Sequence, residues 1–220
     1  MKVKVKICGI TSPEDAAAAA AAGADMIGLM FYESSPRYVS MSAAAAISQA
    51  VPMHVLRVGV FVNPDESTVW QAITACGLGL LQFHGDEPPA FCRRFGLMCI
   101  KAFRIRDESS LAALTRYDTD AWLLDAWMPG KVGGTGITFN WALARKARSL
   151  GRPIFLAGGL TPENVARAIH EVQPFAVDVS SGVEIAPGRK CPDKMRAFVQ
   201  AVREASARLP SEPSESAGEA

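Results

Sequence analysis

The chain alternates strictly between short apolar segments and longer segments with helix signals, and this order constrains the fold more than any other feature. Expected strands cover residues 3–8, 26–32, 54–62, 79–85, 98–105, 121–127, 153–160 and 175–182. Expected helices cover residues 13–23, 42–50, 64–76, 88–95, 107–114, a segment from 140, a segment opened by 161–164, and 192–208. Such alternation requires parallel strands joined by helical crossovers. We therefore predict an α/β protein with a single-domain (β/α)8 TIM barrel over residues 1–208.

An open, doubly wound sheet is the competing architecture for this alternation. That fold usually carries a G-x-G-x-x-G motif after its first strand, and the motif is absent here. The last residues, 209–220, are acidic and rich in serine and proline, and they contain no bulky apolar side chain after Leu209. We expect this tail to be disordered.

Composition excludes several function classes. The 220 residues carry a formal net charge of +1, which implies no attraction to nucleic acid or to a membrane surface. The N-terminus alternates charged and apolar residues, as a strand does and a signal peptide does not, so we expect a cytoplasmic protein. The five cysteines include no C-x-x-C pair, which argues against zinc and against a disulfide framework. Three of them (Cys76, Cys92 and Cys99) are expected to be small buried side chains.

Residues that could take part in catalysis or ligand binding gather where the expected strands end. In a barrel, active sites lie at the C-terminal ends of the strands. The residues at these ends are Cys8, His84, Asp125, Gly158, Gly159, Ser180, Ser181 and Gly182. The loops after the seventh and eighth strands are the usual phosphate site of such barrels, and glycines let backbone N–H groups approach an anion. We therefore expect phosphate at Gly158, Gly159, Ser181 and Gly182, where the alternative is that the glycines only make tight turns.

Side-chain alternation predicts which residues point into the barrel. In the first strand the apolar residues should meet the helices, so Lys6 and Cys8 should face the lumen. The same rule predicts a polar lumen that contains Lys6, Gln82, His84, Lys101 and Asp178. We expect Lys101 and Asp178 to belong to buried ion pairs. For Lys6 the hypothesis is that its charge favours the thiolate form of Cys8. A thiolate base opposite the carboxylic acid of Asp125, beside a phosphate site, suggests an isomerase or epimerase of a sugar phosphate.

Several sequence blocks occur in an order that resembles a known family. They are KICGIT (6–11), FYESSPRYVS (31–40), RVGVFVN (57–63), QFHGDE (82–87), LLDA (123–126), GGTGITFNW (133–141), AGGLTPENV (157–165) and AVDVSSGVEIAPG (176–188). Together they closely resemble the phosphoribosylanthranilate isomerases of tryptophan biosynthesis, over residues 3 to 205. Three departures stand out: Asn140 and Cys191 where aspartate is common, and Phe83 where an aliphatic residue is usual.

The resemblance implies an Amadori rearrangement that needs no metal or organic cofactor. By its motifs, Asp125 is the general acid that opens the ribose ring, and Cys8 is the general base that removes the C2′ proton. Arg37 of the S-P-R block is expected to hold the anthranilate carboxylate, where the alternative is a surface arginine on a mobile loop. The other substrate-binding residues are expected to be His84, Gly158, Gly159, Asp178, Ser180, Ser181 and Gly182. His84 has at most a positioning role, because the acid and the base are already assigned.

Some questions stay open at this point. The same rearrangement on a larger substrate in histidine biosynthesis, as a second activity, is one alternative, and a non-catalytic barrel that binds a phosphorylated metabolite is another. Trp127 and Trp141 either cover the substrate or only pack, and Gly133, Gly134 and Gly136 suit a loop that closes over it. The expected partner is the small-molecule substrate, without nucleic acid or membrane. The protein is expected to be a monomer or a homodimer.

Overall fold

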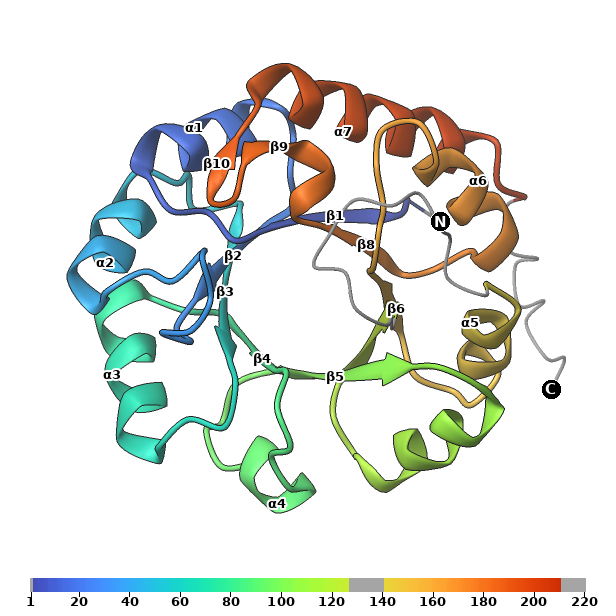
Figure 1. The fold of residues 1–220 in the computed structure, drawn as a ribbon, viewed down its shortest axis with the longest axis horizontal. Coiled ribbons are helices and arrows are strands. Elements are labelled where there is room, and N and C mark those ends of the chain that lie inside the picture. Colours follow the sequence, from blue (N-terminus) through green and yellow to red (C-terminus); the bar gives the residue numbers. More distant parts are fainter. Residues whose placement is uncertain (1, 127–140, 211–220) are drawn as a thin grey trace, which may run out of the picture.

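The protein folds as a closed barrel of eight parallel strands with helices around the outside (Figure 1). This structure, a computed structural model, describes residues 2–126 and 141–210. The strands are β1 (Lys4–Cys8), β2 (Met26–Met30), β3 (Leu56–Phe61), β4 (Leu80–Phe83), β5 (Cys99–Ile105), β6 (Ala121–Ala126), β7 (Ile154–Leu156) and β8 (Ala176–Val179). Pairing of β8 with β1 closes the ring, with Lys6 opposite Asp178. The predicted TIM barrel is confirmed.

The outer layer consists of α1 (Pro13–Ala21), α2 (Met41–Gln49), α3 (Glu66–Cys76), α4 (Pro89–Cys92), η1 (Glu108–Arg116), α5 (Trp141–Arg148), α6 (Val165–Val172) and α7 (Pro192–Ala207). Local sequence sets their ends. Ser12 begins α1 by accepting a hydrogen bond from the Asp15 backbone N–H at 3.1 Å, and Pro13 occupies the first turn. After α1 the chain turns at Gly23, whose φ of +92° suits glycine.

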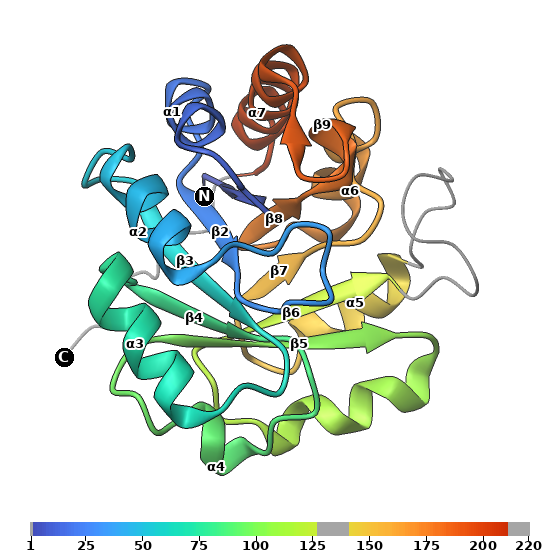
Figure 2. The ribbon, with the colours of Figure 1, turned by 60° about the vertical axis from the view of Figure 1, so that its left-hand side comes forward.

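Two elements differ in detail from those expected. Residues 108–116 form a 3₁₀ helix, η1, and not an α-helix. Asp107 and Ser110 form a capping box at its start, in which each side chain accepts a hydrogen bond from a backbone N–H group. A two-stranded hairpin of β9 (Glu184–Ala186) and β10 (Arg189–Lys190) follows a short 3₁₀ turn, η2 (Ser181–Val183), and was not among the expected elements. In Figure 2 this hairpin lies beside α7 and above the barrel.

Side-chain alternation separates two apolar clusters. Val5 and Ile7 face the helices, within the larger cluster between the barrel and its outer layer. Cys8 faces inward together with Val58, Val60, Leu123 and Phe155, which fill the lumen. The prediction that Lys6 and Cys8 point inward is thereby confirmed. In the part of the chain that the structure describes, no helix is both long and apolar enough to cross a membrane.

Lys101 was wrongly placed in the lumen by the sequence. Its neighbours Ile100 and Ala102 belong to the inner cluster, so Lys101 points outward. There its Nζ lies 3.0 Å from Glu87 Oε2 and 2.6 Å from the Gly85 carbonyl oxygen. Lys101 therefore belongs to a buried ion pair, as expected, but this pair lies outside the lumen and fastens the loop after β4 to β5.

The structure also shows where the cysteines and one of the two tryptophans lie. Cys76, Cys92 and Cys99 are buried and free of disulfides, as predicted. Trp141 packs in the outer core with the Arg167 guanidinium 4.9 Å from its ring centroid, so it is a packing residue. Trp127, the glycines of 133–136, Asn140 and residues 211–220 of the tail lie outside the described residues.

Candidate active site

Cys8 ends β1 inside the mouth of the barrel, where its side chain is almost fully buried at 7% exposure. The fully buried ammonium of Lys6, two residues earlier on the same face, lies beside the Cys8 thiol. Neighbouring β2 makes room for both groups at Gly28. A Cβ there would lie 2.7 Å from Cys8 Sγ and 3.2 Å from Lys6 Nζ. Glycine at this position therefore lets the sulfur and the ammonium share one small space.

Burial and the neighbouring charges shift the pKa of the Cys8 thiol in opposite directions. Burial raises the pKa of Cys8 above its ordinary value, and the positive charge of Lys6 lowers that pKa without cancelling the effect. Asp178 adds to the rise in the Cys8 pKa, because its carboxylate is also close. Burial alone would lower the pKa of Lys6, but Asp178 and Cys8 raise it above its ordinary value, which keeps the ammonium charged. Lys6 thus acts in the direction that the sequence suggested, but its effect is smaller than that of burial.

Asp125 and His84 face each other on another part of the same mouth. Asp125 lies near the end of β6, and its side chain is 33% exposed. His84 follows β4, with Nε2 3.5 Å from Asp125 Oδ2 and Nδ1 3.1 Å from Gln82 Nε2. With the Gln82 amide donating, Nδ1 accepts and the neutral ring presents its Nε2–H to Asp125. Gln82 and His84 therefore form a short chain that ends at the Asp125 carboxyl.

The loops after β7 and β8 meet closely. Gly158 and Gly159 have φ values of +85° and +68°, which only glycine adopts readily. Gly182 lies so close to the Leu160 carbonyl oxygen that a Cβ would overlap it. Asn164, just before α6, fixes the loop after β7, because its side chain accepts from the Thr161 N–H at 2.8 Å and donates to the Gly159 carbonyl at 2.9 Å. The two glycine loops that the sequence predicted as a phosphate cradle are thus adjacent.

Sequence reasoning missed two charged residues at this mouth, Glu184 and Lys190. Both are buried, and Lys190 Nζ lies 2.7 Å from Glu184 Oε1. Arg37, expected to bind substrate, donates to the same carboxylate through Nε at 2.8 Å and Nη2 at 2.7 Å. The Pro187-Gly188 dipeptide between Glu184 and Lys190 is a turn signal that predicts a hairpin and would have paired them.

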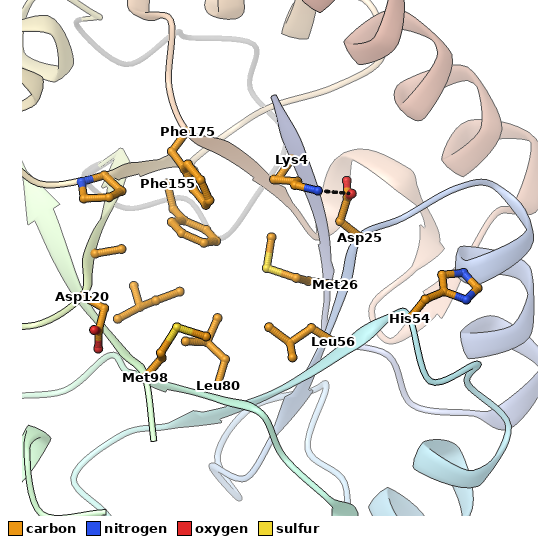
Figure 3. Close-up of a pocket in the computed structure, with 13 residues that line it drawn as sticks. Lys4, Asp25, Met26, His54, Leu56, Leu80, Met98, Asp120, Phe155 and Phe175 are labelled. Atoms are coloured by element: carbon orange, nitrogen blue, oxygen red, sulfur yellow. Dashed lines mark hydrogen bonds and ion pairs between the residues drawn. The ribbon is translucent and has the colours of Figure 1, made fainter. Parts of the chain in front are cut away.

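A separate cavity of about 390 Å³ opens at the other end of the barrel, where the strands begin (Figure 3). Its walls are mostly apolar, with Met26, Leu56, Leu80, Phe155 and Phe175 around it and the Lys4–Asp25 ion pair at its edge. None of the predicted site residues lines it. Among the residues that the structure describes, no group of three or more His, Cys, Asp and Glu side chains could hold a metal ion.

Comparison with known proteins identifies the family of this chain. The family model described as N-(5′-phosphoribosyl)anthranilate (PRA) isomerase matches residues 5–201. The chain belongs to the PRA isomerase family. A PRA isomerase from Trichlorobacter lovleyi is 52% identical over 203 residues, which cover 92% of this chain and 99% of that relative.

Solved PRA isomerase structures share the whole barrel. The enzyme from Thermotoga maritima has a TM-score of 0.87 and 42% identity, covering 92% of this chain and 99% of its own. A PRA isomerase in complex with reduced 1-(o-carboxyphenylamino)-1-deoxyribulose 5-phosphate has a TM-score of 0.83 and 40% identity, with the same two coverages. This chain therefore shares its fold with these PRA isomerases over 92% of its own length and 99% of theirs.

Proposed function

We propose that this PRA isomerase converts N-(5′-phosphoribosyl)anthranilate, an aminoaldose, into the aminoketose 1-(o-carboxyphenylamino)-1-deoxyribulose 5-phosphate. The observation that carries the proposal is the pairing of two groups at one mouth. A cysteine with an ammonium beside it ends β1, and a carboxyl with a histidine beside it ends β6. These groups supply the base and the acid that an aldose–ketose isomerisation requires.

Asp125 acts first, as the general acid. Its proton passes to the ribose ring oxygen while the C1′–O bond breaks and the nitrogen lone pair forms a C=N bond. The product of this step is a protonated Schiff base, which withdraws electrons and makes the C2′ proton acidic. Partial exposure of Asp125 leaves one side of the carboxyl open to the substrate, and the His84 ring on the other side fixes its orientation.

Cys8 then acts as the general base. Its thiolate takes the C2′ proton, and the C–H electrons form the C1′=C2′ bond of an enolamine. The enolamine becomes the ketone when its hydroxyl loses a proton and C1′ gains one. Lys6 assists by placing a positive charge next to the sulfur, and Asp178 keeps Lys6 protonated and in place.

The charged ends of the substrate define the rest of the site. Arg37 binds the anthranilate carboxylate, since a guanidinium has more donors than its contact with Glu184 uses. Gly158, Gly159, Ser181 and Gly182 offer backbone N–H groups to the phosphate. Ser180, whose Oγ lies close to Gly9, completes the set of substrate-binding residues with His84 and Asp178.

The wider setting follows from the same proposal. Residues 1–208 form one catalytic domain, and residues 209–220 follow it as a short tail. The protein acts in the cytoplasm on a small molecule, without a metal or organic cofactor. It works as a monomer or a homodimer, which sedimentation velocity distinguishes.

The decisive experiment follows the fluorescence of phosphoribosylanthranilate, formed in situ, as the purified protein consumes it. Wild type is run beside Cys8→Ala and Asp125→Asn, and each variant is expected to lose at least about a hundredfold in kcat. Cys76→Ala is the matched control, because that thiol is equally buried but lies in the outer core. Binding of the reduced product analogue without turnover by wild type would favour the non-catalytic alternative, and turnover of the histidine-pathway substrate would add a second activity.

A further inference from the structure

One buried carboxylate, that of Glu184, lies between two cations at the active-site mouth. Arg37 approaches it with two parallel hydrogen bonds, and Lys190 Nζ lies 2.7 Å from Oε1. Glu184 and Lys190 expose 5% and 0% of their side chains, and Arg37 exposes 17%. A carboxylate shared in this way fixes the positions of both cations.

The hairpin that carries Glu184 and Lys190 is fastened to the barrel without any substrate. Antiparallel pairing of β9 with β10 sets Lys190 opposite Glu184. The Thr11 hydroxyl donates to the Gly188 carbonyl, and the Lys190 backbone N–H donates to Asp15 Oδ2 at 3.0 Å. Glu184 therefore occupies a fixed point above the end of β1, from which it can hold flexible side chains.

Arg37 is held next to the proposed base. It lies over Gly9, the residue after Cys8, so closely that a Cβ on Gly9 would overlap Arg37 Cδ. Glu184 accepts hydrogen bonds from Nε and Nη2 of Arg37, and Nη1 of Arg37 makes no hydrogen bond with the described residues. The guanidinium is therefore fixed on one side and offers donors on the other.

Lys190 connects Glu184 to the phosphate loop. Its Nζ lies 3.3 Å from the Ser180 carbonyl oxygen and 3.4 Å from Ser180 Oγ. In a trans peptide the carbonyl and the following N–H point in opposite directions. Holding the Ser180 carbonyl therefore turns the Ser181 N–H away from Lys190, and it sets the start of the loop that includes Gly182.

The charge state of Glu184 suits this arrangement. Burial alone would raise its pKa, but hydrogen bonds from Arg37 and Lys190 hold the pKa of Glu184 below its ordinary value. The carboxylate is thus ionised at neutral pH and neutralises one of the two cations. One net positive charge remains for the anionic groups of a ligand.

We propose that Glu184 is a positioning residue that aligns both anion-binding ends of the site at once. Through Arg37 it orders the group that receives the substrate carboxylate, and through Lys190 it orders the loop that receives the phosphate. Glu184 itself does not touch the substrate. This inference rests on the proposed function, because it assigns Arg37 and the 181–182 loop to the two ends of that substrate.

The first test compares Glu184→Gln with Asp25→Asn. Asp25 is a matched control, since it is likewise shared by a lysine and an arginine (Lys4 and Arg203), but at the opposite end of the barrel. Glu184→Gln is expected to raise KM about tenfold or more, with kcat within about threefold of wild type, because binding and not chemistry is weakened. It should also weaken calorimetric binding of the reduced product analogue and competitive inhibition by inorganic phosphate. Asp25→Asn should change none of these values.

A double-mutant cycle separates positioning from general damage. Glu184 acts partly through Arg37, so the KM increases of Glu184→Gln and Arg37→Ala should be clearly less than multiplicative in the double variant. Multiplicative effects, or an equal KM rise in Asp25→Asn, would overturn the proposal. Glu184→Asp replaces Glu184→Gln if circular dichroism shows the latter to be unfolded. Absence of turnover in wild type would refute the proposed function alone, because phosphate binding still tests Glu184.

Discussion

Lys6 Nζ lies 2.8 Å from Asp178 Oδ1 inside the barrel, and the same ammonium lies beside the Cys8 thiol. The register of β1 with β8 sets Lys6 directly opposite Asp178, so this ion pair is built into the closure of the barrel. Cys8 therefore responds to two opposite charges. Changing either charge should move the pKa of the thiol in a defined direction.

The first prediction concerns the thiol itself. Lys6→Met should raise the Cys8 pKa further, because the attraction of the ammonium for the thiolate is lost. Asp178→Asn should lower the Cys8 pKa, because the repulsion of the carboxylate for the thiolate is lost. The measurement is the pH dependence of iodoacetamide alkylation at Cys8, followed by mass spectrometry, with Cys8→Ala as the background. Equal pKa values in wild type and Lys6→Met would contradict the assigned role of Lys6.

A second prediction concerns the pH dependence of catalysis. Only the thiolate of Cys8 can take a proton, and burial raises its pKa, so little thiolate is present at neutral pH. The value of kcat/KM should therefore rise as the pH increases above neutrality and follow the alkylation curve. In Lys6→Met the rising limb should move to higher pH. A flat profile over this range would show that thiolate formation does not limit the reaction.

Third, His84 should matter less than Asp125. His84 Nε2 lies 3.5 Å from Asp125 Oδ2. The proposed role of the ring is to hold this carboxyl in place, without exchanging a proton with the substrate. We expect His84→Ala to lower kcat by about tenfold, against at least about a hundredfold for Asp125→Asn. Steady-state kinetics of both variants provide the comparison, and Gln82→Leu should resemble His84→Ala. A loss in His84→Ala as large as that in Asp125→Asn would make the histidine a catalytic residue.

The sequence predicted the inner face of β1 because its two faces differ in polarity. Alternation of lysine with valine and isoleucine leaves one arrangement that buries the apolar side chains against the helices. In β5 both faces are largely apolar, with Cys99 and Phe103 on one and Ile100 and Ala102 on the other. Strands covered on both faces carry no such contrast, which is why Lys101 was assigned to the wrong side.

Contacts between distant segments set a second limit on prediction. Arg37 and Glu184 are 147 residues apart, and their hydrogen bonds depend on how the loop after β2 and the β9–β10 hairpin meet above the barrel. Strand and helix patterns place the elements but not the side chains of the loops between them. The hairpin turn itself could be predicted from Pro187-Gly188, whereas the contact between the hairpin and Arg37 could not.

A fourth prediction tests the phosphate cradle. A methyl group on Gly182 would overlap the Leu160 carbonyl oxygen, so Gly182→Ala must separate the loops after β7 and β8. We expect KM to rise about tenfold or more and inhibition by inorganic phosphate to weaken, while kcat changes less. Gly96→Ala is a suitable control, because a Cβ there meets nothing within 4 Å and only its φ of +64° causes strain. Equal effects of the two substitutions on KM would exclude a phosphate role for the loop.

The last prediction uses a departure from the family pattern. Cys191 is the N-cap residue of α7, with extended backbone and no hydrogen bond from its side chain to the helix. Its partly exposed position allows a carboxylate without burial of charge. In Cys191→Asp, the new side chain can accept a backbone N–H of the first turn and interact favourably with the helix dipole. We expect a gain of about 0.5–2 kcal/mol in the free energy of unfolding.

Urea denaturation of Cys191→Asp and Cys191→Ala measures this gain, since alanine removes the thiol but cannot cap the helix. The stabilisation requires an ionised carboxylate whose pKa is lowered by folding. It should therefore be present at neutral pH and disappear as the pH falls through that lowered pKa. Equal stabilities of the aspartate and alanine variants at neutral pH would mean that the first turn of α7 gains nothing from a side-chain cap.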